Sequence, residues 1–128
     1  MSASETVGRY GAAATTGDMA ALAATLSPDV VWHQPGDNPL SGDHVGPDAV
    51  VAHLGRFMQL SSGTFALSTE SVIEAGDLVA TTVRFSASRP GRTDLDQRGV
   101  DVFRVVDGRI AEVWLISEDQ DDEDAFWG

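Results

Sequence analysis

One carboxylate in this sequence lies where apolar neighbours are expected, at Asp101 in the segment DVFRVV. That segment runs into Asp107-Gly108, a pair typical of the two-residue turn of a β-hairpin. Such a turn pairs Val106 with Arg109, and counting outward from it places Asp101 opposite Trp114. Because side chains alternate along a strand, one face of the hairpin collects every second residue. The residues expected on the face of Asp101 are Phe103, Val105, Trp114 and Ile116.

A carboxylate on an apolar face must find a partner or take up a proton, because burying the bare charge is costly. Asp101 is therefore a candidate acid or base. In the structural alternative, Asp101 pairs with Arg98, Arg84 or a backbone N–H near a sheet edge. The residue pattern leaves both interpretations open.

The elements that must position Asp101 divide into helices first and strands after. The first expected helix carries Val7, Tyr10 and Ala14 and ends at Gly17. The second is capped by Asp18 and carries Met19, Leu22 and Leu26. The third runs from Pro47 to Gly63. The expected strands cover residues 30–34, 64–75, 78–88, 95–106 and 109–117, and residues 35–46 are expected to form a loop. This order predicts an α+β domain, in which helices pack on one face of a curved antiparallel sheet and enclose an apolar ligand pocket.

Both faces of the last hairpin are largely apolar. The face opposite Asp101 is expected to carry Val100, Val102, Arg104, Ala111, Val113 and Leu115. The helices can cover only one face, so we expect a second copy of the chain to cover the other. The sequence thus predicts a homodimer built on Val102, Val113 and Leu115.

The composition narrows the classes of partner and location. The chain has 128 residues, a formal net charge of −12 and no cysteine, so disulfides and thiolate metal sites are excluded. The negative charge disfavours nucleic acids and anionic membranes as partners. The first 17 residues lack the pattern of a secretion signal, and we expect a cytoplasmic protein that forms a single domain over residues 1–128. Residues 118–128 form an acidic tail, expected to be solvated along its charged run, with Phe126 and Trp127 folded back on the domain or its partner.

The three histidines do not form a metal motif. His33, His44 and His53 lack the close spacing of a metal site, and no carboxylate spacing completes one. We expect neither a metal nor a cofactor. Alternation along the first strand places His33 on the face opposite Gln34, away from the pocket if Gln34 points inward.

Two segments carry a resemblance to a known family. Residues 7–42, VGRYGAAATTGDMAALAATLSPDVVWHQPGDNPLSG, and residues 101–114, DVFRVVDGRIAEVW, resemble the ketosteroid isomerases and the wider SnoaL-like group of the nuclear transport factor two-like superfamily. The resemblance implies a cone-shaped α+β fold. It implies no single function, because this fold supports isomerases, cyclases, hydrolases and binding modules.

The resemblance to ketosteroid isomerases assigns roles to two residues, but this chain lacks the general base of those enzymes. Tyr10 matches the oxyanion-hole tyrosine, and Asp101 matches the protonated aspartic acid beside it. Both can donate hydrogen bonds to an oxygen that becomes negative in an enolate. Gln34 stands where those isomerases have their general base, and an amide cannot take a proton from carbon. Gln34 is instead expected to hydrogen-bond a substrate oxygen.

The resemblance to SnoaL-like polyketide cyclases requires only one acid/base aspartate, at the position of Asp101. It implies a small cofactor-free enzyme that cyclises or isomerises an apolar carbonyl compound, polyketide- or steroid-like. The residues expected to bind the substrate are Gln34, Trp32, Phe57, Phe103, Trp114 and Ile116. The alternative is a non-catalytic binding or accessory protein with the same pocket.

Overall fold

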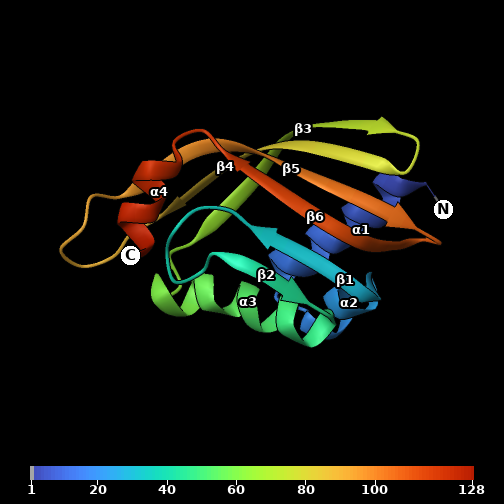
Figure 1. The fold of residues 1–128 in the computed structure, drawn as a ribbon, viewed down its shortest axis with the longest axis horizontal. Helices are drawn as coiled ribbons and strands as arrows, with labels where there is room; N and C mark the ends of the chain where they lie inside the picture. Colours follow the sequence, from blue (N-terminus) through green and yellow to red (C-terminus); the bar gives the residue numbers. More distant parts are fainter. Residues whose placement is uncertain (1) are drawn as a thin grey trace.

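The computed structural model describes residues 2–128, which form four helices and one curved six-stranded sheet (Figure 1). The elements in chain order are α1 (Ala3–Thr16), α2 (Met19–Ala24), β1 (Leu26–Gln34), β2 (Gly42–Val45), α3 (Pro47–Leu60), β3 (Ala66–Ala75), β4 (Leu78–Ala87), β5 (Leu95–Val106), β6 (Arg109–Ser117) and α4 (Gln120–Trp127). None of the helices in this described part is long and apolar enough to cross a membrane.

The sheet has the strand order β2-β1-β6-β5-β4-β3. All neighbouring strands are antiparallel except β1 and β6, which run parallel where the first hairpin joins the β3–β6 meander. Helices α1 and α2 lie against the concave face, α3 lies beside β1 and β2, and α4 sits at one end (Figure 1). The expected α+β fold is confirmed.

The local signals for the helices are realised in the structure. Ser2 forms a capping box with Glu5 at the start of α1, and Gly17 ends that helix in the left-handed conformation with φ of 73°. The side chain of Asp18 caps α2, which ends before Leu26 rather than including it. Leu26 instead begins β1, and a short strand, β2, lies within the segment expected to be loop.

The concave side of the sheet holds two apolar clusters. One lies beneath α1 and α2 and includes Val7, Leu22, Trp32 and Phe103. The other lies toward α4 and consists of Leu40, Phe57, Val83, Phe85, Ala87, Leu95, Phe126 and Trp127. Together they hold the helices on one face of the sheet and leave the other face uncovered within the chain.

The last hairpin keeps its predicted register for the two residue pairs next to the turn and then departs from it. Val106 pairs with Arg109 and Val105 with Ile110 as expected, but the next pair is Arg104 with Glu112. Ala111 is therefore an extra residue in β6, a β-bulge. Because one extra residue moves every following side chain to the opposite face, Asp101 lies opposite Leu115 and not Trp114.

The bulge corrects two predictions. Trp114 and Ile116 were expected to bind substrate on the concave face, but they pair with Val102 and Val100 on the outer face, and Ile116 is 62% exposed. Val113 was expected at the centre of a dimer interface, but it lies in the core with none of its surface exposed. The uncovered apolar surface is instead formed by Val100, Val102, Trp114 and Ile116.

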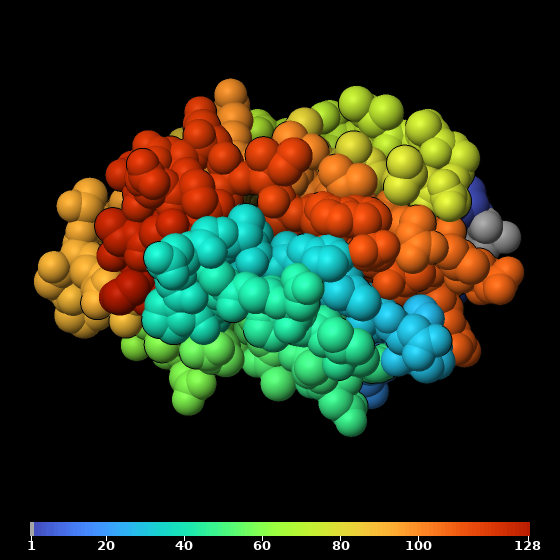
Figure 2. All heavy atoms as spheres, viewed as in Figure 1, coloured from blue at the N-terminus to red at the C-terminus, as the bar shows by residue number. Residues whose placement is uncertain are grey.

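The acidic tail is a helix and not a solvated end. Asp119 caps α4, and the amide group of Gln97 exchanges two hydrogen bonds with the backbone of Asp119, at 2.9 and 3.0 Å. At the other end, Arg89 and Arg92 donate to backbone carbonyls of α4 at 2.7 to 3.0 Å. Figure 2 shows α4 packed between the loop after β1 and the loop after β4. The expected return of Phe126 and Trp127 onto the domain is confirmed, since both are buried.

Candidate functional site

Asp101 lies on the concave face of β5, between Thr81 of β4 and Leu115 of β6. Its carboxyl group has no hydrogen-bond partner among residues 2–128. The two arginines considered as partners are engaged elsewhere: Arg84 pairs with Asp96 at 2.9 Å and Arg98 pairs with Glu70 at 3.0 Å. Asp101 is thus not a structural ion-pair partner of either arginine.

The electrostatic environment of Asp101 favours its neutral form. Burial raises the pKa of Asp101 to about 7, and the negative charge of Glu123 on α4 adds to this effect. By its exposed fraction, Asp101 is half-buried. At neutral pH the carboxyl group can therefore exist in both protonation states and exchange a proton with a bound molecule.

Tyr10 reaches the same interior from α1. Its ring packs at a tilt against Phe103, with centroids 5.6 Å apart, and against Trp32, at 6.3 Å. Burial, followed by the charge of Asp101, raises the pKa of Tyr10 far above its usual value. The hydroxyl therefore stays protonated and remains a hydrogen-bond donor at every physiological pH.

Gln34 is held by two donors on its carbonyl oxygen. Nε1 of Trp32 and Nε2 of His53 each lie 3.0 Å from Oε1 of Gln34. Because an indole nitrogen only donates, the atom it contacts must be the amide oxygen. This fixes the orientation of the amide group and leaves the NH2 end of Gln34 without a protein acceptor among the described residues. The NH2 group of Gln34 is thus a donor that is not used within the described chain.

His53 is neutral and acts as a donor to Gln34. Burial, with smaller effects from His44 and Arg56, lowers the pKa of His53 to about 3. The ring of His44 stacks on it at 3.8 Å, and Nδ1 of His53 is a buried acceptor with no hydrogen-bond partner. His33 lies on the outer face, between Asp43 at 2.8 Å and Glu112 at 2.6 Å, away from this group as expected.

The remaining predicted wall residues separate into two groups. Trp32, Phe57 and Phe103 lie on the concave side with exposures of 4%, 8% and 3%. Phe57 packs edge-on against His53 and Trp127, so it joins the polar group to the α4 cluster. Trp114 and Ile116 belong to the outer face and do not line this interior.

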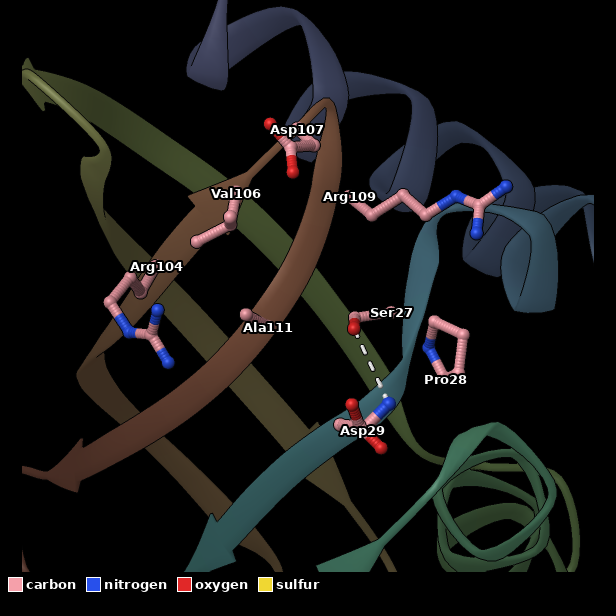
Figure 3. A pocket seen from close by; sticks show the side chains of 8 residues that line it. All are labelled: Ser27, Pro28, Asp29, Arg104, Val106, Asp107, Arg109 and Ala111. Carbon is pink, nitrogen blue, oxygen red and sulfur yellow. Dashed lines mark hydrogen bonds between the residues drawn. The ribbon is translucent and has the colours of Figure 1, made fainter.

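Two hollows lie outside this interior. One of about 340 Å3 is found near the tip of the last hairpin and is lined by Ser27, Pro28, Asp29, Arg104, Val106, Asp107, Arg109 and Ala111 (Figure 3). Its lining includes two arginines and two aspartates, so it has no net charge that would select an anion. The other, of about 290 Å3, is lined by the ion-paired side chains of Arg84, Asp96 and Arg98 with Gln97 and Glu118. Neither hollow contains a residue of the predicted site.

The sequence reasoning missed Thr81, His53 and Glu123 as members of the interior. Thr81 is buried opposite Asp101. This position follows from strand pairing alone and could have been predicted from the sequence. The hydrogen bond from His53 to Gln34 and the burial of Glu123 depend on how helices pack, which no local pattern records. Within residues 2–128, no cluster of three or more histidine or acidic side chains is arranged to hold a metal ion.

The interior group combines hydrogen-bond donors with one titratable carboxyl group. Tyr10 and Gln34 present hydrogen-bond donors, and Asp101 is a donor when protonated and an acceptor when ionised. The apolar side chains around them exclude water and strengthen each of these interactions. This arrangement suits an apolar compound with a carbonyl or enol oxygen.

Comparisons with known proteins agree with this arrangement of elements. An uncharacterised protein, Rv0034 of Mycobacterium tuberculosis, is 36% identical over 122 residues, covering 94% of this chain and 92% of its own. A crystal structure of a protein of unknown function with a cystatin-like fold from Xanthomonas campestris is 46% identical, with a TM-score of 0.92 and coverage of 100% and 99%.

A second structure is more distant and shares the fold. TerC, co-crystallised with polyporic acid, is 20% identical, with a TM-score of 0.80 and coverage of 91% of both chains. The model of the SnoaL-like domain matches residues 7–113 of this chain, which include most of α1, all of α2 and α3, Gln34, Asp101 and the first part of β6. The chain therefore belongs to the SnoaL-like family, whose members share the cone-shaped fold of the nuclear transport factor two-like superfamily.

Proposed function

We propose that this protein binds an apolar carbonyl compound between its sheet and helices, and cyclises or isomerises it through an enolate-like intermediate. The observation that carries the proposal is the position of Asp101. Its carboxyl group lies inside the fold beside Tyr10, is not hydrogen-bonded within the described chain, and has a pKa raised to about 7. A proton-transfer group needs such a pKa to act efficiently near neutral pH.

In this proposal, Asp101 exchanges a proton with the substrate. As a carboxylate it takes a proton from an acidic carbon, and as a carboxylic acid it returns a proton to carbon or oxygen. An isomerisation that moves one proton, or an aldol closure of an already acidic substrate, requires a single shuttle of this kind. Gln34 is not required as a base.

Tyr10 and Gln34 stabilise the oxygen that becomes negative. The Tyr10 hydroxyl cannot ionise near neutral pH, and the Gln34 amide is fixed by Trp32 and His53. Donors that are already oriented, in a site that excludes water, lower the energy of a developing oxyanion without reorganising. The two residues thereby favour the enolate over the ketone.

Family membership supports a ligand-binding or cyclase-type role for this protein. Structures that share this fold include a putative polyketide cyclase from Sinorhizobium meliloti and TerC, which was co-crystallised with polyporic acid. The alternative function is non-catalytic binding of the same class of compound. It needs the donors and the apolar surroundings but not the proton exchange at Asp101.

The test measures ligand binding and the protonation of Asp101 together. 2-Naphthol is the probe, because it presents a planar apolar body and an oxygen that resembles an enolate. We expect binding to the wild-type protein by calorimetry, a weakening of about fivefold in Tyr10→Phe, and a similar loss in Asp101→Asn, since one hydrogen bond to the naphthol oxygen contributes about 1 kcal/mol. Asp122→Asn, an exposed charge on α4, is the matched control and should bind normally.

The two functions differ in one further measurement. A catalyst must exchange the α-protons of a ketone, so 2-tetralone in deuterated buffer should lose its α-hydrogen NMR signals faster with the wild-type protein than with Asp101→Asn. Binding of 2-naphthol without any acceleration of this exchange would favour the non-catalytic function. Absence of binding would contradict both.

A further inference from the structure

The C-terminal helix brings a second carboxyl group to the concave side of the sheet. Glu123 of α4 is only 4% exposed, although its neighbours Asp121 and Asp122 are exposed to solvent. Its Oε2 accepts a hydrogen bond from Oγ of Ser117 at 3.0 Å, and its Oε1 accepts one from Nε2 of Gln120 at 3.2 Å. No arginine or histidine of the described chain forms an ion pair with it.

Strand register places this carboxyl group close to Asp101. Ser117, which binds Glu123, pairs with Gly99 on β5, and Asp101 follows Gly99 by two residues on the same face. The ring of Phe85 covers Gly99, with its Cε1 atom 3.2 Å from the position that a Cβ atom would take there, so the surroundings of the two groups are apolar. The negative charge of Glu123 acts on Asp101, which agrees with this proximity.

No opposite charge lies between the two carboxyl groups. Tyr10 from α1 is held in its neutral form, and His53 from α3 is neutral as well. The other charged and polar side chains near α4 have hydrogen-bond partners of their own. Gln97 binds the backbone of Asp119, and Asp124 binds Asn38 at 2.8 Å. Arg89 and Arg92 bind carbonyl groups at the far end of the helix. Two carboxyl groups therefore share a poorly solvated interior without a cation.

We propose that Glu123 is a positioning residue for Asp101: α4 is part of the interior site, and the buried carboxylate of Glu123 keeps the proton on Asp101. Two negative charges at close range in such surroundings cannot both form at low cost. Glu123 has hydrogen bonds from Ser117 and Gln120 that stabilise its charged form, whereas Asp101 has none. Burial, and to a smaller extent the charge of Asp124, raise the pKa of Glu123 as well, but the hydrogen bonds from Ser117 and Gln120 oppose this effect. We therefore expect Glu123 to ionise first and Asp101 to retain its proton into the neutral range.

The effect of Glu123 on Asp101 does not depend on the proposed function. Only the use of the Asp101 proton in catalysis rests on that function. A carboxylic acid that is still protonated near neutral pH donates a hydrogen bond to a substrate oxygen, which an ionised aspartate cannot do. The acidic C-terminal helix would then determine the pH range over which Asp101 stays protonated, although it lies outside the strands that bear Asp101 and Gln34.

The experiment follows the carboxyl carbons of Asp101 and Glu123 by NMR in a pH titration of the full chain without ligand. We expect Glu123→Gln to shift the titration midpoint of Asp101 to lower pH, and Glu123→Asp, which keeps the charge, to leave it nearer the wild-type value. Asp122→Asn removes an equal charge from the exposed side of α4 and should leave the midpoint of Asp101 unchanged. An equal shift in Glu123→Gln and Asp122→Asn would overturn the proposal, because the overall charge would then explain both.

A second measurement needs no variant and remains decisive if Glu123→Gln fails to fold. In the wild-type protein, the Glu123 carboxyl should titrate at lower pH than that of Asp101. The reverse order would overturn the proposal. None of these titrations involves a ligand, so they can succeed when 2-naphthol does not bind, and they can fail when it does.

Discussion

Nε2 of His53, on α3, lies 3.0 Å from Oε1 of Gln34, at the end of β1. With Trp32 on the same oxygen, this hydrogen bond ties the third helix to the first strand through one buried amide. Replacing Gln34 with Leu would leave two buried donors unpaired, and each such group costs about 1 to 3 kcal/mol. We expect Gln34→Leu to lower the free energy of unfolding by about 2 kcal/mol or more in urea denaturation.

The matched control for that variant is Gln34→Glu, which keeps an oxygen acceptor at the same reach. It should retain most of the stability lost in Gln34→Leu. Equal stability of Gln34→Leu and wild-type protein would show that Trp32 and His53 do not depend on this acceptor.

The raised pKa of Asp101 predicts a pH dependence of stability. Its pKa is about 7 in the folded protein and 3.8 when unperturbed, so folding favours the protonated form. The stability due to this group is fully present below pH 4 and is lost as the pH rises through 7. One pKa unit corresponds to 1.36 kcal/mol, so the loss is about 4 kcal/mol at most. Thermal unfolding between pH 4 and 8 should show a smaller decline in Asp101→Asn than in the wild-type protein.

The uncovered outer face of the sheet predicts a homodimer, on residues that differ from those expected from sequence. Ile116 and Trp114 replace Val113 as the central apolar side chains of that face. We expect sedimentation of the wild-type protein at twice the 13.5 kDa mass of the chain and a monomer for Ile116→Arg. Met58→Arg, at a half-exposed apolar position on α3, is the control and should remain dimeric. A monomeric wild-type protein at micromolar concentration would contradict the prediction.

The packing of α4 predicts that the last residues contribute to stability. Trp127 is 2% exposed and packs edge-on against Phe57, with ring centroids 5.3 Å apart. Truncation of a buried tryptophan to alanine costs about 3 to 5 kcal/mol, and Trp127→Ala should lower the melting temperature accordingly. Deletion of residues 122–128 should lower it at least as far. Asp121→Ala, on the exposed side of the same helix, should change it little; an unchanged melting temperature in Trp127→Ala would mean that α4 is not part of the folded core.

The sequence by itself determined the class of fold, and it singled out Asp101 as a candidate acid or base. Helix caps at Asp18 and Gly17, the turn at Asp107-Gly108 and the alternation of the strands act over a few residues, so they can be recognised locally. Asp101 stood out for the same reason, because an acid among alternating apolar residues is visible without knowledge of the fold.

Only the tertiary structure decided which residues surround Asp101. A single bulged residue, Ala111, turned Trp114 and Ile116 outward and Val113 and Leu115 inward, and no local signal in RIAEVW marks that insertion. The acidic run after Ser117 is typical of a solvated end, yet contacts with Gln97 and with the distant loops fold it into a helix that buries Glu123. Register and helix packing depend on contacts between residues far apart in the chain, and these contacts determined the composition of the site.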